Sequence, residues 1–137
     1  MVTRRSEATW EGDLRDGKGT MTVGEDYYTG AFTYVSRFEE GDQTNPEELI
    51  GAAHAGCFSM ALSNELDKAG FTPERVHTTA TVHLEEGSIT RVELDTEAEV
   101  PDISDEEFQE IAAEAKENCP VSRLLAAAEI TLDAELV

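Results

Sequence analysis

The sequence has few basic residues and no long uncharged segment. Ten Lys and Arg stand against 30 Asp and Glu, so the formal net charge is −20. Because such a surface repels phosphate groups, we expect neither nucleic acid nor a membrane surface as a partner. The longest uncharged run, residues 49–64, is also shorter than the roughly 18 residues that indicate a membrane-spanning helix.

Metal ligands are equally scarce, because the chain contains two cysteines and three histidines. Neither a CxxC nor an HxxxH spacing occurs, whereas a zinc site needs three or four protein ligands. The chain also lacks a glycine-rich phosphate loop and a serine nucleophile elbow. We therefore expect no metal and no bound cofactor, and we expect His54 to pack in the core or to orient a neighbouring residue.

The N-terminal sequence MVTRRSEATW lacks the apolar segment of a secretory signal. We therefore expect a cytoplasmic protein, in which two cysteines are more often reactive or buried than joined in a structural disulfide. Acidic residues are spread through the chain, which suits a halophilic cytosol because salt screens their repulsion. The length of 137 residues predicts a single domain over residues 1–137.

The uncharged run lies in a segment that predicts a long helix between residues 44 and 70. Pro46 suits the first turn, Glu47 and Glu48 face the positive end of the helix dipole, and Gly70 can end the helix. The residues between these ends are apolar or small on every face, so we expect a buried helix.

Five small residues near the middle of this helix leave room for another backbone. They allow two interpretations: close packing of the helix against a sheet, or a crossing with the same helix of a second subunit. The residues are Gly51, Ala52, Ala53, Ala55 and Gly56.

Periodicity and turn residues predict the remaining elements. We expect strands over residues 3–11, 20–23 and 28–38 before the helix, and a hairpin over residues 76–84 and 89–100 after it. Helices over residues 104–118 and 121–127 and a last strand over residues 129–137 complete the chain. The order βββ-α-ββ-αα-β belongs to the α+β class, with largely antiparallel sheets.

The two cysteines occupy different local settings. Cys57 lies deep in the uncharged helix, where a thiol is often only a small core residue with a raised pKa. Reactivity would require a cation from elsewhere, and Arg37, at the end of a predicted strand that leads to the helix, is the best placed. Cys119 precedes Pro120 at a helix break, where a new helix N-terminus can stabilise a thiolate. Such a pair fits a thiol that attacks peroxide and a second thiol that forms a disulfide with it.

Several motifs resemble those of the OsmC/Ohr family of thiol-dependent peroxidases. They are TNPEELIGAAHAGCFSMAL around Cys57, SRFEE around Arg37 and NCPVSRLL around Cys119. The opening ATWEGDLRDGKGT and the closing AEITLDAEL match as well, so the resemblance covers essentially the whole chain. Val121 stands where the Ohr branch often has tyrosine, which favours the OsmC branch.

This resemblance implies an intertwined homodimer with sheets wrapped around long central helices. It also implies reduction of organic hydroperoxides, and of hydrogen peroxide less well, to alcohol and water. By resemblance, Cys57 is the peroxidatic cysteine, Cys119 is the resolving cysteine, Arg37 holds the Cys57 thiolate and Glu47 holds Arg37. The family's reductant is a dithiol, typically a dihydrolipoyl group.

Helix geometry adds one expectation about this site. Glu47 and Cys57 are ten residues apart, which is about 15 Å along one straight helix. A composite site of two antiparallel helices that cross near Ala52 would bring them together, and a kink near Gly51 is the alternative.

Two other functions fit the same cysteines. In the first, Cys57 and Cys119 form a regulatory disulfide in a non-catalytic redox sensor or a module that binds a small apolar ligand. In the second, the protein is a structural dimer whose buried cysteines are inert.

Overall fold

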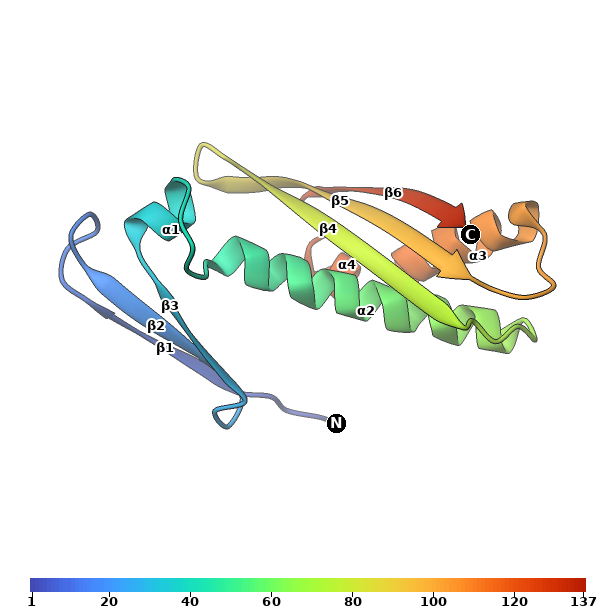
Figure 1. Cartoon of the computed structure of the whole chain (residues 1–137), viewed down its shortest axis with the longest axis horizontal. Helices are drawn as coiled ribbons and strands as arrows, with labels where there is room; N and C mark the ends of the chain where they lie inside the picture. The colour runs from blue at the N-terminus through green and yellow to red at the C-terminus, as the bar shows by residue number, and fades with distance from the viewer. The chain divides into compact units, whose positions relative to one another are not determined.

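The chain forms six strands and four helices, whose arrangement along the chain can be followed in Figure 1. The computed structural model describes residues 1–137. It contains β1 (Ser6–Glu11), β2 (Lys18–Val23), β3 (Tyr28–Phe32), α1 (Tyr34–Phe38), α2 (Pro46–Lys68), β4 (Arg75–Glu85), β5 (Ser88–Glu99), α3 (Asp105–Asn118), α4 (Pro120–Leu124) and β6 (Glu129–Leu136). The α+β class is therefore confirmed. Internal contacts divide the chain into two units, Met1–Leu49 and Ile50–Val137, and the single domain stays a prediction.

The first unit contains a three-stranded antiparallel sheet in the order β1-β2-β3. The turn between β2 and β3 uses Gly24 and Asp26 in left-handed conformation, with φ of 63° and 64°. Both residue types tolerate this conformation, which lets the chain reverse tightly. The predicted meander is confirmed in number and order of strands.

The third strand is shorter than the predicted 28–38, because a helix replaces its second half. Thr33 caps α1 by accepting a hydrogen bond from the amide of Ser36, whose hydroxyl in turn accepts one from the Thr33 amide. This reciprocal capping outweighs the strand preference of the aromatic and β-branched residues that follow. The expectation that Arg37 ends a strand was therefore wrong, and Arg37 lies in the last turn of α1.

The second unit contains a sheet in the order β4-β5-β6. Strands β4 and β5 form the predicted antiparallel hairpin, closed by Glu86 and Gly87 at positive φ. Strand β6 pairs with β5 in parallel, because α3 and α4 carry the chain back across the sheet between the two strands. The largely antiparallel arrangement holds, with this one parallel pair as the exception.

The core of the second unit lies between one face of this sheet and two helices. Alternate residues of β5 face inward, as the sequence pattern predicts. The core residues are Phe58, Leu62 and Leu66 of α2, Val92, Leu94 and Ala98 of β5, and Phe108, Ile111, Ala112 and Ala115 of α3. This two-layer arrangement fixes α2 against the sheet and places α4 at the end of α3.

Within this single chain, helix α2 is buried on one face and exposed on the other. Burial of the exposed face, which a second subunit would provide, stays a prediction. A Cβ at Gly51 would lie 3.4 Å from the carbonyl oxygen of Ala80, so the helix packs closely on β4 there. Ala52, Ala53, Gly56 and Met60 are exposed. Gly51 thus contacts the sheet, whereas Ala52, Ala53, Gly56 and Met60 form an exposed strip of α2.

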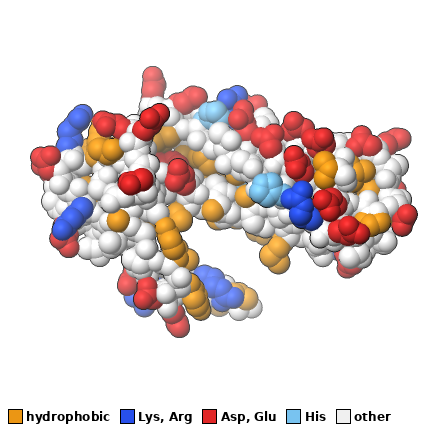
Figure 2. Space-filling view, viewed as in Figure 1, with side chains coloured by type: hydrophobic (Ala, Val, Ile, Leu, Met, Phe, Trp, Pro, Cys, Tyr) orange, Lys and Arg blue, Asp and Glu red, His pale blue; other side chains and the backbone are white.

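The acidic side chains are scattered over the visible surface rather than gathered in one cluster (Figure 2). This distribution follows the spread of acidic residues along the sequence. None of the helices combines the length and the apolar character that crossing a membrane requires.

Candidate active site

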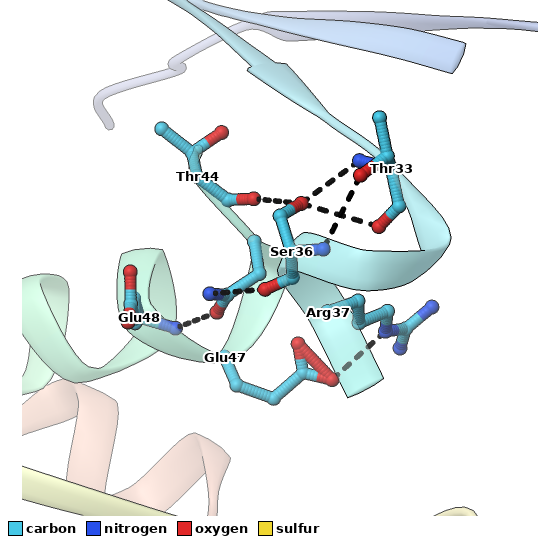
Figure 3. Close-up of polar contacts among 7 residues, drawn as sticks. Thr33, Ser36, Arg37, Thr44, Glu47 and Glu48 are labelled. Atoms are coloured by element: carbon cyan, nitrogen blue, oxygen red, sulfur yellow. Dashed lines mark hydrogen bonds and ion pairs between the residues drawn. The ribbon is translucent and has the colours of Figure 1, made fainter. Parts of the chain in front are cut away.

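The first unit holds Arg37 and Glu47 in direct contact (Figure 3). The Arg37 Nε donates a hydrogen bond to Glu47 Oε1 over 2.9 Å. Asn45 joins the elements that carry these residues, because its side chain donates to the carbonyl of Ser36 and accepts from the amide of Glu48. The ion pair is therefore held between α1 and the start of α2 by local capping bonds.

The Arg37–Glu47 ion pair leaves some hydrogen-bonding atoms of both side chains without a partner. Glu47 is buried, yet its Oε2 has no hydrogen-bond partner. The Arg37 side chain is 40% exposed, and an arginine has further donors beyond the Nε that it uses here. Because buried polar atoms are normally paired, the free oxygen and the free guanidinium nitrogens can bind an additional polar group.

An apolar pocket of about 220 Å³ lies beside Arg37 in the same unit. Its walls include Trp10 and Phe32, whose ring centres are 5.3 Å apart. Tyr34 and Phe38 also line it. The pocket therefore joins a guanidinium to a lining suited to an alkyl or aryl group.

The second unit holds the two cysteines together. Their sulfurs are 2.9 Å apart, at hydrogen-bonding distance, and both thiols are free. Cys57 lies on α2 and is partly exposed, whereas Cys119 occupies the N-cap position of α4 and is fully buried. A small movement of either side chain would permit a disulfide, whose sulfurs are about 2.05 Å apart.

The surroundings shift the two thiols in opposite directions. Burial raises the pKa of Cys57, and the adjacent sulfur of Cys119 raises it further. Burial alone would also raise the pKa of Cys119. The neighbouring Cys57 thiol and the polar groups of Ser122 and Val121 outweigh burial and lower that pKa. Cys57 thus gains no net activation within its own unit, which agrees with the expectation that a cation from elsewhere is needed.

Two further residues adjoin this pair and were not predicted together. His54 Nε2 and Ser122 Oγ are 2.8 Å apart, and both side chains are buried. In the sequence they stand three residues before Cys57 and three after Cys119, which is one helical turn in each case. The symmetric spacing is the signal that could have linked them.

Comparison with known proteins identifies the family. Residues 39–135 match the family described as OsmC-like protein. The chain belongs to the OsmC family. It is 46% identical over 140 aligned residues to the peroxiredoxin OsmC of Escherichia coli strain K12, covering 98% of this chain and 97% of that protein. The same values hold for the peroxiredoxin OsmC of Shigella flexneri.

Solved structures share the fold at lower identity. An OsmC-like protein of Mycoplasma pneumoniae superposes with a TM-score of 0.77 at 14% identity, covering 99% of this chain and 98% of that one. An organic hydroperoxide resistance protein of Elizabethkingia anophelis gives a TM-score of 0.74 at 23% identity, covering 99% of both chains. The predicted OsmC/Ohr fold is therefore confirmed.

This relationship also confirms the predicted enzyme class, because a named peroxiredoxin aligns with nearly the whole chain of this OsmC-family protein. The structure brings Arg37 to Glu47 and Cys57 to Cys119. Arg37 and Cys57 belong to different units, so their cooperation stays a prediction.

Proposed function

We propose that this protein reduces organic hydroperoxides, and hydrogen peroxide less well, through Cys57 and Cys119. The Cys57 thiolate attacks the outer peroxide oxygen, the O–O bond breaks, and the alcohol leaves after taking up a proton. The Cys57 sulfenic acid then reacts with Cys119 to give a disulfide and water. A dithiol reductant returns both cysteines to thiols and is itself oxidised to a disulfide.

The distance between the two sulfurs carries this proposal. At 2.9 Å, Cys119 lies within reach of the sulfur that would bear the sulfenic acid. Both thiols are free, so the pair has the composition of the reduced enzyme before turnover. An inert core cysteine would not require a second buried thiol beside it.

The Arg37–Glu47 pair supplies the charge that Cys57 lacks in this proposal. Glu47 lies in the first turn of α2 and Cys57 ten residues later, a rise of about 15 Å. A homodimer in which the two α2 helices cross antiparallel would place this ion pair beside Cys57 of the partner subunit. The exposed Ala52 and Gly56 favour such a crossing, because small side chains let two helices approach closely.

The apolar pocket beside Arg37 supports an organic substrate. Aromatic walls contribute most of the lining, which favours the alkyl or aryl part of a hydroperoxide over hydrogen peroxide. The polar peroxide group would meet the guanidinium of Arg37. The dithiol reductant and the cytoplasmic location stay predictions from the sequence.

One stoichiometric pulse of cumene hydroperoxide tests the proposal. The wild-type protein should form one Cys57–Cys119 disulfide per chain, visible by mass spectrometry after alkylation, and should turn over repeatedly with a dithiol. Cys57→Ser should consume no peroxide, and undiminished turnover in that variant would exclude the mechanism. Cys119→Ser should react once and then stall or over-oxidise. A disulfide that no dithiol recycles would instead favour the redox-sensor function.

A further inference from the structure

The reaction through Cys57 and Cys119 gives no role to one exposed apolar residue, Leu14. It lies in the loop of residues 12–17 that joins β1 to β2, where every other residue is charged or glycine. Leu14 is 60% exposed, and an isolated exposed leucine needs no explanation by itself. This one lines the apolar pocket beside Arg37, so it forms part of the surface that the organic group of a substrate would contact.

Two aromatic rings give this pocket a fixed wall on the side of the sheet. Trp10 and Phe32 both line it. A Cβ at Gly19 would lie 2.6 Å from the Phe32 ring and 2.7 Å from the Trp10 ring, so both rings lie directly on the backbone of that glycine. Because the rings cannot move closer to the sheet, the size of the pocket is set by the residues on its other sides.

Hydrogen bonds hold the loop that carries Leu14. Trp10 Nε1 donates to the carbonyl oxygens of Gly12 and Asp13 over 3.1 Å and 3.2 Å. The Asp13 carboxylate accepts a hydrogen bond from the amide of Asp16 over 2.7 Å, which closes a turn within the loop. Leu14 follows Asp13 directly, so these bonds fix the backbone from which its side chain extends.

The same loop also contacts helix α1. The Arg15 guanidinium lies 4.7 Å from the centre of the Tyr34 ring, and a cation in this position is attracted to the ring. Tyr34 itself lines the pocket, and Arg15 is the residue after Leu14. This contact therefore limits how far the loop and α1 can separate, and with that the width of the pocket.

The volume of the pocket restricts the size of its occupant. It measures about 220 Å³, whereas an apolar cavity of about 150 Å³ holds one benzene molecule. The pocket can thus accept one aromatic ring with a small branched substituent, and an extended chain would have to leave it. Arg37 is the charged residue of the lining, so it is the group that the polar peroxide end would meet.

We propose that Leu14 is a specificity-determining residue, which limits the organic part of the hydroperoxide to a compact branched or single-ring group. Asp13 is a positioning residue, because its turn keeps Leu14 at the pocket. This inference deepens the proposed function and rests on it, since it concerns the substrate of the same peroxidase. The chemical steps at Cys57 and Cys119 are unchanged by it.

Two substitutions of Leu14 change the pocket in opposite directions. Stopped-flow measurement of Cys57 oxidation should show that wild type prefers cumene hydroperoxide at least about tenfold over para-diisopropylbenzene monohydroperoxide, which carries one more isopropyl group. Leu14→Ala should reduce this preference to within about threefold, because it opens the pocket. Leu14→Trp should fill it, and should slow the reaction with cumene hydroperoxide at least about tenfold relative to that with hydrogen peroxide.

A matched control truncates an apolar residue of the same sheet outside the pocket. Val23 on β2 is 39% exposed and does not line the pocket, so Val23→Ala should keep the wild-type preference. Asp13→Ala should reduce the preference about threefold, whereas Asp13→Asn retains an acceptor for the turn and should keep it. A ratio of two rates is not altered by partial loss of folded protein, so these effects do not report stability.

Binding can also be measured without any reaction. Trp10 is the single tryptophan of the chain and lines the pocket, so its fluorescence reports an occupant. In Cys57→Ser, cumyl alcohol, the reduction product of cumene hydroperoxide, should change this fluorescence with saturation. Adding Leu14→Ala should weaken the binding at least about fivefold, because apolar contact with the ligand is lost.

The outcomes separate this inference from the proposed function. A wild-type protein in which neither hydroperoxide oxidises Cys57 would overturn the function, and this inference with it. Oxidation by both at equal rates in wild type, or an unchanged preference in Leu14→Ala, would overturn only the role of Leu14. Equal affinity for cumyl alcohol with and without Leu14→Ala would do the same. An unchanged preference in Asp13→Ala would overturn the positioning role of Asp13.

Discussion

The sulfur of Cys119 lies 2.9 Å from the sulfur of Cys57, but only Cys57 is partly exposed. Molecules from solvent therefore meet Cys57 first, whereas Cys119 reacts through its neighbour. This asymmetry agrees with a peroxidatic role for Cys57 and a resolving role for Cys119. It also explains why Cys119 can have the lower pKa without being the thiol that peroxide attacks.

The asymmetry predicts unequal reactivity of the two single thiols. In the Cys119→Ser variant, Cys57 should react with a disulfide reagent at least about tenfold faster than Cys119 does in Cys57→Ser. Cys119 becomes reachable only when the structure opens locally, which costs free energy. Measuring both reaction rates over a range of pH separates the effect of solvent exposure from the effect of the thiolate fraction. Denaturant should make the two cysteines react at similar rates. Equal native rates at equal thiolate fraction would contradict the assignment.

The ion pair of the first unit predicts a large effect on the first chemical step. Arg37→Ala should slow the reaction of Cys57 with peroxide about 100-fold, because a preorganised charge near the developing anion is lost. Glu47→Gln should have a smaller effect in the same direction, since Arg37 remains. Stopped-flow measurement of the oxidation step gives both rates.

A matched control for Arg37→Ala is Arg75→Ala. Arg75 is half-exposed on β4 and pairs with Glu97 and Glu99, so the change in net charge is the same. Its oxidation rate should stay within about twofold of wild type, because surface ion pairs contribute little. Equal losses in the two variants would show that overall charge, and not the Arg37–Glu47 pair, sets the rate.

The buried histidine predicts a loss of stability in mild acid. Burial lowers the pKa of His54 below its ordinary 6.5, so the unfolded chain binds a proton at pH values where the folded chain does not. The free energy of unfolding should therefore decrease as the pH falls below about 6.5, by at most about 1.4 kcal/mol per pH unit. The loss should level off below the folded-state pKa.

Urea denaturation of wild type and His54→Gln at several pH values checks this prediction. The other two histidines remain in both proteins, so the difference between the two curves isolates His54. That difference should change between pH 7.5 and pH 5.5 and be constant above pH 7.5. Parallel curves throughout would show that His54 titrates equally in the folded and unfolded states.

Most of the fold could be predicted from the sequence, because strands, helices and turns are indicated by residues that are close together in the chain. The alternation along β5 and the Glu86–Gly87 turn predicted the hairpin. Helix α1 was missed because Tyr34 and Val35 favour strands, whereas the reciprocal capping around Thr33 decides the conformation. The parallel direction of β6 was missed as well, because it depends on the path of α3 and α4 and not on the strand's own residues.

The candidate site could be predicted in part, because some of its residues lie in local sequence motifs. Motifs around Cys57 and Cys119 predicted the pair that the structure brings together. Ser122 was not linked to His54 because their contact joins residues 68 positions apart, and only their equal spacing from the two cysteines indicates it. Isolated polar residues of this kind gain a meaning only when the tertiary structure shows what they face.

The exposed strip of α2 predicts a subunit contact. Met60 is 78% exposed, and nothing lies within 4 Å of a Cβ placed at Gly56. Met60→Glu should convert a dimer to monomers in sedimentation velocity and should reduce peroxidase turnover, because the composite site would be lost. Thr81→Glu adds the same charge at an exposed position of β4 and should leave the dimer intact. A monomeric wild type would contradict the crossing of α2 helices.

The acidic surface predicts stabilisation by salt, and one pair of residues allows a sharp test. Asp95 and Asp133 are exposed register partners on β5 and β6, and like charges opposite one another destabilise a sheet. Asp133→Lys should raise the free energy of unfolding by about 1 kcal/mol at low salt, and Asp133→Asn by about half as much. The advantage should shrink in 1 M KCl, where the Debye length is only about 3 Å. Denaturation at both salt concentrations gives the free-energy difference between each of the two variants and wild type. A lysine variant that is less stable than wild type at low salt would show that repulsion between these strands does not limit stability.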